Sequence, residues 1–188
     1  MNATRRRARL GACVAAGLAL ALHVTPLYAY VLPAAEEFAP APLRVLGEGE
    51  MRWLGFKLYD VRLLVAAGAS APEADPHALA IRYARDIDGR RLVDTSIDEM
   101  RRLGERDEAT LQRWREELAR ALPSVRAGDT LVGLHQPGEG ARFWHEGRLT
   151  AEIDDPELAR AFFAIWLDAR TREPELRARL LGLDGRAQ

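Results

Sequence analysis

The chain has almost no cysteine, since Cys13 is the only one among 188 residues. Cys13 lies in a segment that we expect to be removed, so the mature protein would have neither a disulfide nor thiol chemistry, and its fold must depend on an apolar core. Lysine is equally scarce: Lys57 is the only lysine, and every other basic residue is arginine. We attribute this bias to a high-GC genome rather than to phosphate recognition.

An excess of positive charge is also lacking. The chain has 27 basic and 28 acidic side chains, and without the four arginines of its first nine residues it keeps 23 basic and 28 acidic ones, a net charge of −5. Binding to nucleic acid requires a basic face, so the composition argues against it. No repeat, phosphate-cradling glycine loop or Ser-His-Asp set stands out, and we predict no cofactor.

Long apolar runs are absent except for one near the N-terminus. Leu10 to Leu22 are apolar and follow the arginine cluster of residues 5–9, but a bilayer core requires roughly 20 residues. Pro26 and the small residue Ala29 complete the pattern of a cleaved signal peptide over residues 1–29. We therefore expect a periplasmic or secreted protein that begins near Tyr30 and has no membrane span after cleavage. The alternative is a retained N-terminal anchor.

The rest of the chain is predicted to form an extended lead-in over residues 30–42 and one domain over residues 43–183. Strands are expected within residues 43–65, with interruptions near Gly47 and Gly55, and at residues 78–84. Alternation in the second of these strands places Tyr59, Val61 and Leu63 on one face and Asp60 and Arg62 on the other.

Helical spacing of apolar residues predicts helices over residues 89–103 and from Asp107 to Pro123, with Asp107 as an N-cap and Gly104 as a stop signal. Residues 130–136, 141–145 and 148–153 are predicted to be strands joined by tight turns. Asp155 followed by Pro156 begins another helix, and residues 173–181 form a shorter one. This order implies an α+β fold in which helices lie on a largely antiparallel sheet.

The histidines do not suggest a metal site. If Gln136 pairs with Ala141 across the turn, His135 and His145 project from opposite faces of the sheet, while His77 falls in a loop. Zinc requires three or four converging ligands, so we predict no metal.

The same pairing groups Phe143 with Val132 and Leu134 on one face, and Trp144 with Leu131 on the other. Both faces of this part of the sheet are then apolar, although helices are expected on one face only. The second face therefore requires additional cover, a partner or a bound apolar ligand.

Five segments in sequence order resemble bacterial exported chalcone isomerase-like proteins and together span residues 43–182. They are Gly55–Leu63, Arg126–Asp129, Pro137–Gly140 with Phe143–Gly147, Phe163–Leu167, and Leu180–Gly182. The resemblance implies a curved antiparallel β-sheet with a layer of α-helices and a hydrophobic cleft between them. Members of the family cyclise chalcones, bind fatty acids or have no catalytic role.

The resemblance also locates the positions used by the plant enzymes, which need an arginine, a threonine, a tyrosine and an asparagine. Tyr59 aligns near the strand threonine, Leu92 and Glu99 align near the tyrosine and asparagine of the helix, and Arg52 stands nearest to the arginine. Tyr59, Leu92 and Glu99 all depart from the plant pattern, which puts flavanone formation in doubt.

The candidate ligand-binding residues are Arg52, Asp60, Arg62, Arg82 and Trp144. An arginine in an apolar setting can hold a carboxylate through two parallel hydrogen bonds, and Asp60 can align the Arg62 guanidinium. Four of these candidates also have a structural alternative: an ion pair for Asp60 and Arg62, a solvated edge position for Arg82, and a place in the core for Trp144.

We therefore expect non-catalytic binding of a fatty-acid-like or other apolar ligand in the sheet–helix cleft. One alternative is an isomerase that cyclises a chalcone-like substrate with Tyr59 and Arg62. Another is an envelope module that binds a protein partner through the apolar second face. The sequence does not predict the oligomeric state.

Overall fold

The structure is a computed structural model that describes residues 30–33, 42–69, 74–105 and 107–184. The predicted signal peptide and residues 34–41 of the predicted lead-in lie outside the described residues. No helix in the described part of the chain combines the length and the apolar composition that a bilayer crossing requires.

One six-stranded antiparallel sheet forms the centre of the molecule, and its strands lie side by side in chain order. The strands are β1 (Leu43–Trp53), β2 (Phe56–Ala66), β3 (His77–Tyr83), β4 (Thr130–Gln136), β5 (Gly140–His145) and β6 (Arg148–Ile153). β1 runs through Gly47 with only a register shift, and the interruption predicted at Gly55 is a turn between β1 and β2. His77, predicted in a loop, is instead the first residue of β3, opposite His135 of β4.

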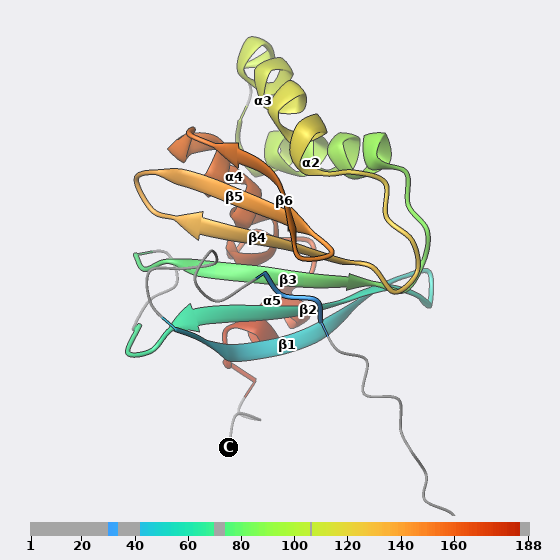
Figure 1. Ribbon diagram of the computed structural model, residues 1–188, viewed down its shortest axis with the longest axis vertical. Helices are drawn as coiled ribbons and strands as arrows, with labels where there is room; N and C mark the ends of the chain where they lie inside the picture. The colour runs from blue at the N-terminus through green and yellow to red at the C-terminus, as the bar shows by residue number, and fades with distance from the viewer. Residues whose placement is uncertain (1–29, 34–41, 70–73, 106, 185–188) are drawn as a thin grey trace, which may run out of the picture.

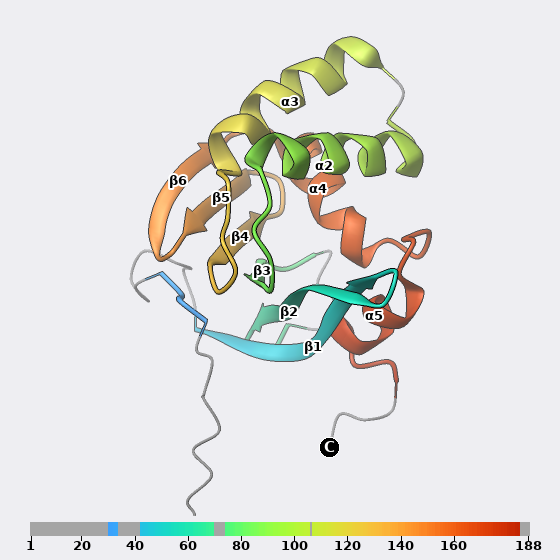
Figure 2. The same cartoon turned by 90° about the vertical axis from the view of Figure 1, so that its right-hand side faces the viewer.

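Four helices complete the described fold: α2 (Gly89–Leu103), α3 (Glu108–Ala121), α4 (Pro156–Leu167) and α5 (Pro174–Leu180). α4 packs on β4 and β5, and α5 packs on β1 at the same face of the sheet (Figures 1 and 2). α2 lies on α4, and α3 bridges α2 and β6. The predicted α+β architecture is confirmed.

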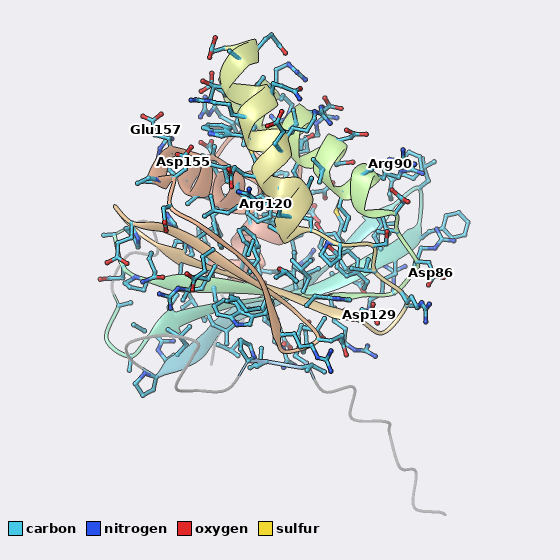
Figure 3. All side chains as sticks on the ribbon, turned by 45° about the horizontal axis from the view of Figure 1, so that its top comes forward. Asp86, Arg90, Arg120, Asp129, Asp155 and Glu157 are labelled. Atoms are coloured by element: carbon cyan, nitrogen blue, oxygen red, sulfur yellow. The ribbon has the colours of Figure 1, made fainter. Side chains whose placement is uncertain are left out.

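The helix ends follow the predicted capping signals. The Asp107 side chain accepts a hydrogen bond from Thr110 N at 2.8 Å, and Gly104 ends α2 with a positive φ of 136°. Asp155 caps α4 through Leu158 N at 3.0 Å and also accepts the indole N–H of Trp114 at 2.9 Å. Asp155 therefore ties α3 to α4 as well as beginning α4; Figure 3 shows it beside Glu157 at the start of the helix.

The main core fills the space between the sheet and the helices. Val61, Leu63 and Phe143 point from the strands into this space and are fully buried. Phe162 of α4 meets Phe143 edge to face, with ring centroids 5.2 Å apart. The predicted assignment of Val61 and Leu63 to one face of β2 is confirmed by this packing.

The register of β4 and β5 differs from the prediction by one residue. Gln136 pairs with Gly140 rather than with Ala141, so every side chain of β5 changes its neighbours. Gly140 has a φ of 151°, and a Cβ there would lie 2.0 Å from the backbone oxygen of Ile153, so only glycine can begin β5 at this point. Because the loop is one residue shorter than expected, His135 and His145 lie on the same face of the sheet, not on opposite faces.

Candidate functional site on the outer face of the sheet

The face of the sheet that points away from α4 and α5, here called the outer face, has cross-strand rows of paired residues. One row runs from Leu64 through Ala78 to Leu134. Its neighbour carries, in order across the strands, Glu48, Arg62, Ala80, Val132 and Trp144. Opposite residues in such rows have Cβ atoms about 4.5–5.5 Å apart, so each row is a continuous strip of side chains.

The middle of the outer face is apolar and buried. We call this surface the apolar floor, and its members are Leu64, Ala78, Ala80, Val132, Leu134 and Trp144. Trp144 therefore groups with Val132 and Leu134, while Leu131 and Phe143 belong to the main core, which corrects the predicted grouping. The two alanines of β3 lie between larger side chains of β2 and β4. The side chains of the apolar floor are therefore shortest along β3.

Charged side chains border the apolar floor at the end nearest the β1–β2 turn. Arg62 donates to Glu48 across the strands at 2.8 Å. Asp60 pairs with Arg82 in the register of β2 and β3 and forms an ion pair with Lys57 at 2.5 Å. The sequence prediction that Asp60 and Arg62 share a face is confirmed, and the structure adds Arg82 to the same border.

The segment Tyr30–Pro33 lies over the outer face, on the side opposite to α4 and α5 (Figures 1 and 2). The Tyr30 ring packs against the apolar floor, and the guanidinium of Arg62 lies 4.3 Å from the ring centroid. Val31 N donates to the side-chain oxygen of Thr130 at 3.2 Å. The cover that the two-sided apolar pattern required therefore comes in part from this segment of the chain itself.

Tyr30 places a polar group among the border charges while its ring covers apolar surface. Burial, with a smaller effect of the Asp60 carboxylate, raises the pKa of Tyr30 to about 12. The hydroxyl consequently stays protonated at neutral pH. The Glu48 carboxylate also raises this pKa, whereas Arg62 and Arg82 lower it.

Arg52 is not part of this border. It lies beside the β1–β2 turn, where its side chain is 54% exposed and pairs with Glu50 at 2.6 Å. Its guanidinium also donates to the backbone oxygen of Gly55 at 3.1 Å. Arg52 and Arg62 are therefore not grouped, because Arg52 lies at the β1–β2 turn, beyond the edge of the apolar floor.

Tyr59 lies on the opposite face of β2 from Arg62, as alternation predicts. Its hydroxyl accepts the indole N–H of Trp166 at 3.0 Å, and burial raises the pKa of Tyr59 to about 12. Glu99 on α2 forms ion pairs with Arg102 at 2.8 Å and with Arg172 at 2.7 Å. The residues that an isomerase would combine are therefore held in separate parts of the fold.

Two hollows in the described structure lie among the helices. The larger, of about 490 Å³, lies between the first turn of α2 and the end of α3 and is called here the α2–α3 groove. Val93, Ala119 and Leu122 contribute to its lining, and Arg115, ion-paired with Asp94, stands at its side. The smaller, of about 150 Å³, lies where α2, α3 and α4 meet. Figure 3 shows Arg90 on the first turn of α2, beside the larger hollow.

The histidines are arranged differently from the prediction. The rings of His77 and His135 lie edge to face, with centroids 4.8 Å apart, in the core against Phe163. His145 is separate from this pair and lies 2.9 Å from the carboxylate of Asp129. Within the described residues, no three His, Cys, Asp or Glu side chains are arranged to hold a metal ion.

Sequence reasoning missed two members of the outer-face site. Tyr30 was assigned to an extended lead-in, and nothing in the sequence around it signals a contact with β2. Glu48 could have been found, because Glu48 and Glu50 alternate along β1 and, after a two-residue turn, must face Arg62 and Asp60.

The chain is similar to known proteins in its sequence and in its fold. Residues 32–182 match the family described as chalcone isomerase-like. An uncharacterized protein of Haemophilus influenzae is 27% identical over 148 residues, which cover 77% of this chain and 72% of that protein. The crystal structure of an Arabidopsis thaliana fatty-acid binding protein matches with a TM-score of 0.57 at 14% identity, covering 77% of this chain and 90% of the plant chain. The predicted resemblance and the predicted fold are confirmed.

Proposed function

This chain belongs to the chalcone isomerase-like family, and from that premise we propose that it is an exported, non-catalytic protein that binds a fatty-acid-like or other apolar ligand. Export is supported by the arginine cluster, the short apolar run and the small residue Ala29 at the predicted cleavage position. A plant protein with the same fold is a fatty-acid binding protein, which supports the class of ligand.

The ligand is placed on the outer face, with its apolar part on the apolar floor and its polar end beside Arg62 and Arg82. The observation that carries this placement is the position of Tyr30, an amphipathic side chain whose ring lies on the floor while its hydroxyl lies among the border charges. A carboxylate there would gain charge-assisted hydrogen bonds from guanidinium groups. The sheet–helix cleft expected from the sequence is filled by core side chains in the described structure.

Binding on the floor requires Tyr30 and its neighbours to move aside. Val31 and Leu32 are 39% and 42% exposed, so these two side chains make few contacts that would keep the segment on the sheet. Each Å² of apolar surface that the ligand covers contributes roughly 25 cal/mol, which offsets the loss of the Tyr30 contacts. The cover and the ligand therefore compete for the same surface.

The test is calorimetric titration of the mature protein with hexadecanoic acid. Arg62→Gln should weaken binding about 10- to 100-fold, because a hydrogen bond to a charged group is lost. The matched control is Arg115→Gln in the α2–α3 groove, since both arginines are about one-third exposed and each pairs with one carboxylate. Tyr30→Ala should strengthen binding, because it removes the competitor from the floor.

Two outcomes would reject the outer-face placement. If Arg115→Gln or the groove-filling Ala119→Phe weakens binding while Arg62→Gln does not, the ligand occupies the α2–α3 groove. If the wild-type protein binds no hexadecanoic acid, and solvent extraction followed by mass spectrometry recovers no apolar molecule from purified protein, ligand binding itself is rejected.

A further inference from the structure

The turn between β1 and β2 exposes three large apolar side chains within four residues. Trp53 is 59% exposed, Leu54 is 76% exposed and Phe56 is 61% exposed. We call these three residues the apolar tip. Elsewhere in the described chain the large exposed apolar side chains are single or, as in Val31 and Leu32, belong to the covering segment. A concentrated apolar patch at the end of a hairpin is typical of a surface that binds a partner.

Folding of the hairpin does not explain the apolar tip. Trp53 pairs with Phe56, so Leu54 and Gly55 form a two-residue turn, with φ values of 49° and 80°. Positive φ at both central positions favours Asn-Gly, because the Cβ of a residue in the left-handed region lies close to the following carbonyl oxygen and only glycine and short polar residues tolerate this routinely. A leucine held in the left-handed region and exposed to water is unfavourable on both counts. Its presence therefore indicates a role outside the fold.

Three cations surround the base of the tip. Arg52 donates to the carbonyl oxygen of Gly55 at 3.1 Å, so its guanidinium is fixed at the turn. Lys57 follows the tip on β2, and the Arg85 guanidinium lies 5.1 Å from the ring centroid of Phe56. Glu50 and Asp60 pair with Arg52 and Lys57 from the strand side, away from the tip. The end of the hairpin thus has apolar side chains outermost and cations behind them.

We propose that the apolar tip docks this protein on the interface of a phospholipid bilayer. Leu54 enters the boundary between headgroups and acyl chains, and Trp53 and Phe56, which pair with each other behind the turn, take the headgroup level that aromatic rings favour. Arg52, Lys57 and Arg85 then lie at the depth of the lipid phosphates. This order of apolar, aromatic and cationic side chains along the hairpin matches the order of layers in a membrane. Three side chains give reversible attachment rather than insertion.

Membrane docking goes beyond the proposed ligand binding and does not depend on it. The tip lies at the end of β1 and β2, whereas the ligand is placed on the outer face of β2 to β5. A carrier of apolar molecules that touches a bilayer can load or release them there, but the tip would attach to the bilayer whether or not the floor is occupied.

The test is flotation of the mature protein with phosphatidylcholine vesicles, with and without phosphatidylglycerol. Leu54→Asn is the informative variant, because it removes the most exposed side chain of the tip and installs the residue that the turn favours. It should fold at least as stably as the wild type and bind vesicles about tenfold more weakly. Leu183→Asn is the control, since Leu183 is 65% exposed and lies outside the tip; it should bind as the wild type does.

A blue shift of the tryptophan emission on vesicle addition, absent in Leu54→Asn and in Trp53→Phe, would support the proposal. It is overturned if the wild type fails to float with either vesicle or if Leu54→Asn floats equally well. Sedimentation analysis distinguishes the bilayer from a second copy of the chain as the partner. If the wild type is a dimer, Leu54→Asn is a monomer and vesicle binding is unchanged, the apolar tip binds a second copy and the proposal is overturned. Hexadecanoic acid affinity should be the same in Leu54→Asn and the wild type, so failure of either proposal leaves the other testable.

Discussion

Acid should destabilise this fold through one buried imidazole. His135 is 6% exposed, is stacked on Phe163 with ring centroids 5.1 Å apart, and meets His77 edge to face. Its Nδ1 has no hydrogen-bond partner among the described residues. Burial, followed by electrostatic interactions with His77 and Arg160, lowers the pKa of His135 to about 4.

The direction of the pH effect follows from comparing the folded and unfolded states. In the unfolded chain the pKa of His135 is about 6.5, so the unfolded state binds the proton more tightly than the folded state does. The stabilisation from a neutral His135 is therefore fully present above about pH 6.5 and is lost as the pH falls towards 4. A difference of about 2.5 pKa units corresponds to at most about 3 kcal/mol, and partial solvation of the ring edge reduces it to about 1–3 kcal/mol.

Urea unfolding of the mature wild type and of His135→Phe, at about pH 7.5 and about pH 4.5, measures this effect. Phenylalanine keeps the stacking on Phe163 and cannot be protonated, so the wild type should lose about 1–3 kcal/mol more than the variant between the two pH values. His145→Gln, on the partly exposed histidine beside Asp129, is the control for a general effect of removing histidine. Equal losses in the wild type and His135→Phe would refute the assignment.

Further tests concern the predicted leader and the packing of the fold. N-terminal sequencing of exported protein should begin at Tyr30, and a sequence that begins at Met1 would indicate a retained anchor. Asp155→Ala should lower the free energy of unfolding by about 2–4 kcal/mol in urea, because it removes an N-cap and leaves the Trp114 indole N–H without its acceptor. Asp107→Ala removes only a cap and should cost about 1 kcal/mol, so equal losses in the two variants would contradict the role given to Asp155. Gly140→Ala should cost more than about 3 kcal/mol by urea unfolding, and a small loss would show that the β4–β5 register does not depend on glycine.

Local signals in the sequence predicted much of the fold. The end of α2 at Gly104 and the beginning of α3 after Asp107 depend on contacts within a few residues, and both were placed correctly. The face of Val61 and Leu63 followed from strand alternation alone. These features are accessible because their physical causes lie within one turn or one strand.

Features that depend on distant parts of the chain could not be predicted from local sequence signals. The β4–β5 register required the close approach of Gly140 to β6, which no local pattern reveals. A slip of one residue then moved Trp144 onto the face of Val132 and reversed the predicted grouping. The contact between Tyr30 and Arg62 joins residues 32 positions apart in the chain, and it depends on how Tyr30–Pro33 lies across the sheet.

The candidate site was predicted in part for the same reason. Asp60 and Arg62 share a face because of alternation within β2, so their association was predictable. Arg82 lies beside them only because of the β2–β3 register, and Arg52 lies away from them because it is held at the β1–β2 turn. The second, apolar face of the sheet was the most useful long-range signal, because a sheet that is apolar on both faces requires a cover on each of them.

We place the apolar ligand on the outer face of the sheet, and the four tryptophans permit one direct measurement of this placement. Their indole N–H resonances report separately on the apolar floor (Trp144), the helix side (Trp114 and Trp166) and the β1–β2 turn (Trp53). In a titration of the ¹⁵N-labelled mature protein with hexadecanoic acid, the Trp144 resonance should shift saturably while Trp114 and Trp166 stay in place. A saturable shift of Trp114 or Trp166 with an unmoved Trp144 would contradict the claim and place the ligand on the helix side of the sheet.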